Sequence, residues 1–252
     1  MKNLTICLTY FRSLSLANLA ASLFSVRQQE MDRVNSVVIV DNNTDDSIRD
    51  VLEVINAADL HVPVDFSSFK HKDTAKAQAW STNVTVRRAQ TTWVFYTRAD
   101  YLLNFDIVRK FLAIVDSKPD TWEGFLVSHG CHLGNSIAEC EATTWRESGP
   151  RVLHGVEYDY TEIDSGVWMA RRETFDRIGG FDERLSAWGH AQTEFQHRMF
   201  TAGVEFVRVP EVLFFHPAHG GEKDIEVGHR QLRDLGLDIR EMWERYPGPK
   251  FY

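Results

Sequence analysis

The sequence predicts an α/β protein in which helices flank a central, mostly parallel sheet. Residues 37–40 form a short, continuous apolar run, which is typical of a strand buried on both faces of a parallel sheet. Such runs alternate with segments of helical spacing over residues 4–96, and this order is typical of strand–helix–strand units. The 252 residues, 43% of them hydrophobic, are enough to bury a large core, and we expect a single domain over residues 1–252.

Four strands and three helices are expected in the amino half. The strands are predicted at residues 4–9, 37–40, 62–66 and 93–96. The helices are predicted at residues 16–23, 47–55 and 74–89. Leu16, Leu19 and Leu23 follow the spacing of a buried helix face. Pro63 predicts that the third strand is an edge strand, because proline cannot donate a hydrogen bond to a sheet.

The second half is richer in Gly, Trp and His, and its strand–helix order is less regular. Strands are predicted at residues 167–170, 204–209 and 212–215. Helices are predicted at residues 172–178 and 194–202, with Gly203 as the C-terminal cap of the second.

Composition narrows the function classes. The chain carries 28 Lys and Arg against 36 Asp and Glu, a net charge of −8, which disfavours generic binding to nucleic acid. Three cysteines are too few and too scattered to predict a disulfide framework. Apolar runs stay well short of the roughly 20 residues that cross a bilayer. We expect a cytoplasmic protein, with peripheral attachment to a membrane as the alternative.

Polar residues that follow the predicted strands are candidates for a nucleotide site, because ligands of parallel sheets bind at the carboxyl ends of the strands. Asp41 ends the second strand, and its carboxylate can accept hydrogen bonds from a nucleobase or from ribose hydroxyls. The alternative role for Asp41 is a turn or helix cap. Arg12, after the first strand, can pair with phosphate, or can be a solvated charge.

Two further residues are candidates for a metal site. Asp100 ends the fourth strand, and His216 follows a strand much later in the chain. A leaving diphosphate gathers negative charge, which a divalent cation held by carboxylate and imidazole can neutralise. Mn²⁺ or Mg²⁺ is the expected ion, and the alternative role for His216 is a hydrogen-bonded histidine at a strand end.

A third group of candidates lies around residue 190. Trp188 beside Gly189 can offer an open aromatic face to a sugar ring, although a core tryptophan is the alternative. Glu194 can orient a hydroxyl or act as a general base, or it can be an exposed helix carboxylate.

The amino-half motifs resemble those of family-2-like glycosyltransferases. Residues 8–12 resemble the end of their first strand, Thr-Tyr-Asn-Arg, and residues 38–46 resemble their second-strand motif, whose Asp contacts the base. Residues 83–96 resemble the helix and strand that lead to their Asp-x-Asp motif, which falls here on residues 98–100. The resemblance implies a GT-A fold with a nucleotide site formed by Thr9, Tyr10, Arg12, Asp41, Asn83 and Arg98.

Residues 165–189 are similar to the acceptor-side segment of galactosyltransferases and polypeptide GalNAc-transferases. The resemblance implies that four residues face the transferred sugar: Gly166, Asp182, Trp188 and Gly189. It implies catalytic positions at His190, Gln192 and Glu194. His216, six residues after Pro210, matches the metal-binding histidine of the GalNAc-transferases.

Three departures from these motifs bear on the chemistry. Arg98 replaces the first acidic residue of Asp-x-Asp. Gln192 stands where inverting relatives have their general base, and an amide cannot accept a proton. Glu194 is two residues further on, where a helix presents a different face, and His190 replaces a glycine as a possible base or ligand.

The sequence therefore predicts a glycosyltransferase that moves a sugar from a nucleotide-sugar, with UDP-sugar expected, to a hydroxyl of a glycan or other acceptor. The nucleotide half is expected at about residues 1–105 and the acceptor half at about 106–252. A divalent cation is expected to assist. One alternative is a metal-independent transferase in which Arg98 neutralises part of the diphosphate charge in place of the cation. The others are a degenerate protein that binds nucleotide or sugar without turnover, and a nucleotidyltransferase. Sugar, acceptor and stereochemistry stay open.

Overall fold

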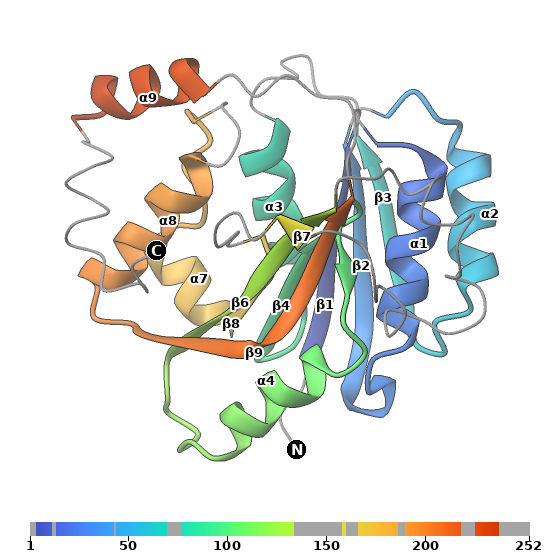
Figure 1. Cartoon of the computed structure of the whole chain (residues 1–252), viewed down its shortest axis with the longest axis horizontal. Helices are drawn as coiled ribbons and strands as arrows, with labels where there is room; N and C mark the ends of the chain where they lie inside the picture. The colour runs from blue at the N-terminus through green and yellow to red at the C-terminus, as the bar shows by residue number, and fades with distance from the viewer. Residues whose placement is uncertain are drawn as a thin grey trace.

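Within the described residues, nine strands form one sheet with helices on both faces (Figure 1). The computed structural model describes residues 4–11, 14–42, 44–69, 77–133, 158–159, 166–185, 190–217 and 225–236. The strands are β1 (Leu4–Phe11), β2 (Val34–Asn42), β3 (Val64–Phe69), β4 (Trp93–Arg98), β5 (Leu102–Leu103), β6 (Gly124–Leu133), β7 (Tyr158–Asp159), β8 (Trp168–Arg171) and β9 (Glu205–Pro217). The α/β class predicted from the sequence is confirmed.

The helices cover the sheet in two layers (Figure 1). They are α1 (Leu16–Arg27), α2 (Ile48–Ala58), α3 (Ala77–Arg88), α4 (Ile107–Asp116), α7 (Arg172–Ile178), α8 (His190–Thr201) and α9 (Ile225–Asp234), with a short 3₁₀ turn at Met31–Arg33. Among the residues that the structure describes, no helix is both long and apolar enough to cross a membrane.

The amino half forms the parallel part of the sheet, in the spatial order β3-β2-β1-β4. The register places Tyr10 opposite Asp41, and Thr9 opposite Arg98. The carboxyl ends of β1, β2 and β4 therefore lie at the same edge of the sheet, as the sequence predicts.

The order continues β8-β6-β9-β5, and β7 pairs with β6. Strands β4 and β8 are antiparallel, whereas β6 and β9 are parallel. The two strands expected at residues 204–209 and 212–215 form one strand, β9, whose register moves from Val209 opposite Ser128 to Leu213 opposite His129. This bulge surrounds Pro210, which has no N–H for the ladder.

Helix α4 and strand β6 were not expected from the sequence. Helix α4 places Ile107, Phe111 and Val115 on one face at helical spacing, and all three are fully buried. Strand β6 lies between β8 and β9 and pairs with both. Gly124 is the first residue of β6, and a Cβ there would lie 2.0 Å from the Trp122 ring, so glycine leaves room for that ring.

Two apolar cores lie on opposite faces of the sheet. Alternate residues of β1, such as Leu8, pack on the side of α1, α2 and α4, whereas Cys7 faces the side of α3, α7 and α8. In the second core the Trp168 ring stacks between Tyr96, at 5.1 Å, and Phe175, at 5.9 Å. Aromatic pairs of this kind stabilise a core by more than the apolar area that they bury.

Candidate active site at the carboxyl edge of the sheet

Asp41 ends β2 with a carboxylate that is already hydrogen-bonded within the protein. Its Oδ1 accepts from the backbone N–H of Thr44, at 3.3 Å, and from the Thr44 hydroxyl, at 2.8 Å. Its Oδ2 accepts from the Ser68 hydroxyl at 2.7 Å. A carboxylate has about four acceptor positions, so these three bonds fix its orientation and leave room for one more donor. Asp41 therefore has the turn role that the sequence left open, and its side chain is buried.

Thr9 and Tyr10 lie at the end of β1 and point to opposite faces of the sheet. The Tyr10 hydroxyl donates a hydrogen bond to the Asp46 carboxylate. Burial, this hydrogen bond and the charges of Asp46 and Asp41 raise the pKa of Tyr10 well above its ordinary value. The Thr9 hydroxyl is 2.9 Å from the Tyr96 hydroxyl, inside the second core. Tyr10 is thus a permanent hydrogen-bond donor beside Asp41, and Thr9 serves the packing of β1 on β4.

Arg98, Asp100 and His216 form a buried charged cluster. The Arg98 side chain donates two hydrogen bonds to Asp100, one from Nε to Oδ1 at 2.9 Å and one from the terminal nitrogen to Oδ2. His216 Nε2 lies 3.1 Å from Asp100 Oδ2. The side chains of Arg98 and Asp100 are only 1% and 0% exposed. The structure therefore brings together the two proposed metal ligands, and it brings Arg98 with them.

Aromatic rings hold the Arg98 guanidinium in place. Its central carbon lies 4.4 Å from the centroid of the Tyr101 ring and 5.5 Å from that of Phe11. The Tyr101 ring packs in turn on Phe214, with ring centroids 4.6 Å apart. A Cβ at Gly166 would lie 2.3 Å from the Tyr101 ring. Gly166 therefore makes room for the ring that supports Arg98.

A divalent cation does not fit the side chains of this cluster as they lie. Mg²⁺ and Mn²⁺ bind carboxylate oxygens directly, at about 2.0–2.1 Å for Mg²⁺. Both oxygens of Asp100 already accept hydrogen bonds from Arg98. In the described part of the chain, no group of three or more His, Cys, Asp or Glu residues is placed to hold a metal ion.

The second group of candidates lines a cavity of about 480 Å³ between α3, α7 and α8. Asn83, Asp182 and Glu194 all line it, so Asn83 lies with the sugar candidates. The Asn83 amide donates to the Phe181 carbonyl at 2.9 Å and accepts from the Phe181 N–H at 2.7 Å. Arg184 hydrogen bonds and charge lower the pKa of Asp182, which is therefore ionised at neutral pH.

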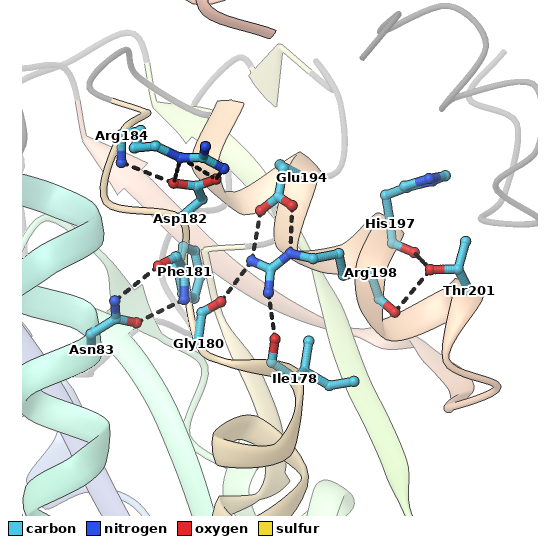
Figure 2. A network of polar contacts seen from close by, with 10 residues as sticks. All are labelled: Asn83, Ile178, Gly180, Phe181, Asp182, Arg184, Glu194, His197, Arg198 and Thr201. Atoms are coloured by element: carbon cyan, nitrogen blue, oxygen red, sulfur yellow. Dashed lines mark hydrogen bonds and ion pairs between the residues drawn. The ribbon is translucent and has the colours of Figure 1, made fainter. Parts of the chain in front are cut away.

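Figure 2 shows how Glu194 and Arg198 fix the wall of this cavity. Both Glu194 oxygens accept hydrogen bonds from Arg198, which lies one helical turn later on α8. Arg198 Nη1 donates to the carbonyl oxygen of Ile178, and Nη2, which also bonds Glu194, donates to that of Gly180, each at 2.6 Å. The Glu194 side chain is 6% exposed. This geometry favours a positioning role for Glu194 over that of a base facing a substrate.

Gly179 and Gly180 provide a matched test of this wall. Both have left-handed backbones, with φ of +93° and +71°. A Cβ at Gly179 has its nearest neighbour at 3.8 Å, whereas one at Gly180 would lie 2.5 Å from Asn83 Oδ1. We expect Gly179→Ala to lower the free energy of unfolding by about 1–2 kcal/mol through backbone strain, and Gly180→Ala by about 2–4 kcal/mol because Asn83 must also move. Urea unfolding checks both, and equal losses would contradict the role of Asn83.

Several candidates lie at the limits of the described residues. Arg12, Trp188 and Gly189 are outside them, and of His190 only the backbone is described, as the first residue of α8. Gln192 is buried on the same helix.

Sequence reasoning missed Tyr101 and Ser68 as parts of the two sites, and it did not pair Arg198 with Glu194. The role of Ser68 appears only in the register of β2 and β3, where it lies opposite Asp41, and the role of Tyr101 appears only in the contact of its ring with Arg98. The spacing of four residues between Glu194 and Arg198 was a usable signal, because such pairs meet on a helix.

The fold is the GT-A fold, which the chain shares with solved structures of glycosyltransferases. A family model described as the N-terminal domain of galactosyltransferase matches residues 153–220. No curated protein matches the sequence significantly. The resemblance to GT-A glycosyltransferases expected from the sequence motifs is therefore confirmed.

Three solved structures illustrate the likeness. TarS of S. aureus has 13% identity and a TM-score of 0.61, over 96% of this chain and 41% of that chain. GalNAc-T7, in complex with UDP, GalNAc and Mn²⁺, has 12% identity and a TM-score of 0.64, over 92% of this chain and 48% of that chain. The mannosyltransferase PcManGT from Pyrobaculum calidifontis, with GDP-Man and Mn²⁺, has 14% identity and a TM-score of 0.58, over 98% and 65%. The chain thus spans less than two thirds of the length of each of these proteins.

Proposed function

We propose that the chain transfers a sugar from a nucleoside-diphosphate sugar to an acceptor hydroxyl. The observation that carries this proposal is the convergence of Asp41, Tyr10 and the Arg98–Asp100–His216 cluster at the carboxyl edge of the parallel strands. This is the edge at which ligands of such sheets bind. Structures of TarS 1–349 with UDP and with UDP-GlcNAc, and of GalNAc-T7 with UDP, favour a UDP-sugar as the donor.

In this proposal the amino half binds the nucleotide and the carboxyl half binds the sugar and the acceptor. Residues 1–105 bind the nucleotide through Asp41 and Tyr10, with Arg12 near the phosphates. Residues 106–252 form the acceptor side, where the ionised Asp182 accepts hydrogen bonds from sugar hydroxyls and Trp188 with Gly189 offers a stacking face. Glu194 acts through Arg198, and His190 is the candidate base because Gln192 cannot accept a proton.

A non-catalytic sugar-nucleotide binder is the second candidate. It is favoured by one observation: at the position of the general base the chain has Gln192, and the nearby Glu194 carboxylate is engaged by Arg198. Such a protein would bind UDP and UDP-sugars but would not cleave the bond between the sugar and UDP.

A donor screen separates these functions. The purified chain is incubated with UDP-glucose, UDP-galactose, their N-acetylamino forms and GDP-mannose, each in EDTA and in Mn²⁺. We expect release of UDP from at least one UDP-sugar. UDP binding in calorimetry without release from any donor would favour the non-catalytic candidate, and absence of both binding and release would reject the proposal.

Asp41→Ala tests the nucleotide site. The loss of a buried acceptor is expected to weaken UDP binding by about 1–2 kcal/mol, a five- to thirty-fold rise in Kd by calorimetry. Ser68→Ala is the matched control, because it removes one partner of Asp41 and leaves the carboxylate in place. An unchanged UDP affinity in a folded Asp41→Ala protein would contradict the site.

A further inference from the structure

We propose that the Arg98 guanidinium is the resident cation of this site. It holds the Asp100 carboxylate in the place of a divalent metal ion, so that the chain binds a nucleoside diphosphate without such an ion. The same geometry makes Asp100 and His216 a latent metal site that opens when Arg98 is removed. The nucleotide part of this inference rests on the proposed function, whereas the part about metal binding does not.

The first support is the hydrogen-bond geometry of the carboxylate. Arg98 contacts both oxygens of Asp100, as a planar guanidinium does in a two-bond pair. His216 Nε2 lies 3.1 Å from Oδ2, on the same carboxylate. Arg98 takes one acceptor position on each oxygen, and His216 lies beside Oδ2, so a metal ion on this carboxylate would lie directly next to the guanidinium. Arg98 therefore already occupies the side of the carboxylate that faces it, and a divalent cation would have to bind against its charge.

The second support is charge. A carboxylate as deeply buried as Asp100 needs a compensating positive charge, and arginine supplies one permanently because its guanidinium stays protonated at physiological pH. A divalent cation beside Asp100 would also be repelled by the adjacent guanidinium. Arg98 stands in place of the first acidic residue of the Asp-x-Asp motif. The chain therefore lacks one carboxylate that could bind a metal ion, and it has the positive charge of the guanidinium instead.

The third support is that Arg98 cannot easily leave. The guanidinium lies over the Tyr101 ring, beside Phe11, and the side chain is 1% exposed. The Tyr101 ring is itself fixed between Gly166 and Phe214. Cation–π contacts of this kind are strongest where they are shielded from water. The surrounding side chains therefore keep Arg98 on Asp100.

The experiment uses the full chain and two probes, Mn²⁺ alone and UDP. Mn²⁺ binding is followed by the loss of the free-ion electron paramagnetic resonance signal, and UDP binding by calorimetry in EDTA and in Mn²⁺. We expect no specific Mn²⁺ binding to the wild type, and a UDP Kd that changes less than about twofold between the two buffers. We expect Arg98→Ala to gain one Mn²⁺ site that Arg98→Ala/Asp100→Asn loses again. Arg109→Ala, which removes an exposed arginine from a surface pair with Asp106, is the control and should gain none.

Specific Mn²⁺ binding to the wild type that Asp100→Asn abolishes would overturn the inference, as would a tenfold or larger loss of UDP affinity in EDTA. Because Arg98→Ala leaves a buried carboxylate without its main partner, circular dichroism checks its fold. If that variant does not fold, the wild-type titrations decide. If UDP does not bind in either buffer, the proposed function fails, and the Mn²⁺ titration still tests the resident cation.

Discussion

Asp100→Asn is expected to lower the free energy of unfolding by about 3–5 kcal/mol, the usual cost of removing one member of a buried ion pair. Asparagine keeps the shape of the side chain but removes its charge. The buried Arg98 guanidinium then loses the carboxylate that holds it. Urea unfolding followed by circular dichroism measures the loss.

Two further variants test whether the cost of Asp100→Asn comes from the burial of the ion pair. Asp116→Asn breaks a two-bond pair with Arg33 that has the same chemistry but lies at the surface, so its cost should stay below about 1 kcal/mol. The double variant Arg98→Met/Asp100→Leu removes both charges at once, and it should be at least about 2 kcal/mol more stable than Asp100→Asn. Equal losses for Asp100→Asn and Asp116→Asn would show that burial of the pair does not matter.

Arg198→Ala is expected to lower the free energy of unfolding by about 3 kcal/mol. The change leaves the buried Glu194 carboxylate without its partner, and it removes the donors to the carbonyl oxygens of Ile178 and Gly180. The backbone turn that carries Gly180 should then loosen. Thermal and urea unfolding measure the stability, and hydrogen exchange of the segment at residues 178–183 measures the turn.

The chain offers a matched control for Arg198. Arg49 pairs with Glu53 at the same spacing of four residues on α2, but the two side chains are 85% and 62% exposed. Arg49→Ala should therefore change the free energy of unfolding by less than about 0.5 kcal/mol. Equal stabilities of Arg198→Ala and Arg49→Ala would contradict the role of Arg198, because its side-chain hydrogen bonds to the carbonyl oxygens of Ile178 and Gly180 would then not stabilise the cavity wall.

The sequence predicted the amino half of the fold well, because local chemistry decides it. The apolar run at residues 37–40 is typical of a strand buried on both faces, and β2 contains it. Asp41 directly follows that run, so its place at the carboxyl edge follows from the strand itself. Helix α4 and strand β6 were missed, since β6 interrupts its apolar residues with Ser128 and Gly130 and is a strand only because β8 and β9 pair with it.

What the sequence by itself determined is the class of fold and the residues that gather at the edge of the sheet, because strand runs and the polar residues after them are local features. What only the tertiary structure decided is how those residues pair. Asp100 was expected to hold a metal ion with His216, but its two oxygens are bound by Arg98, and Glu194 is bound by Arg198. A charge pair depends on distances of a few ångströms between side chains, and these distances are set by the sheet register and by the rings of Tyr101 and Phe214 rather than by sequence spacing.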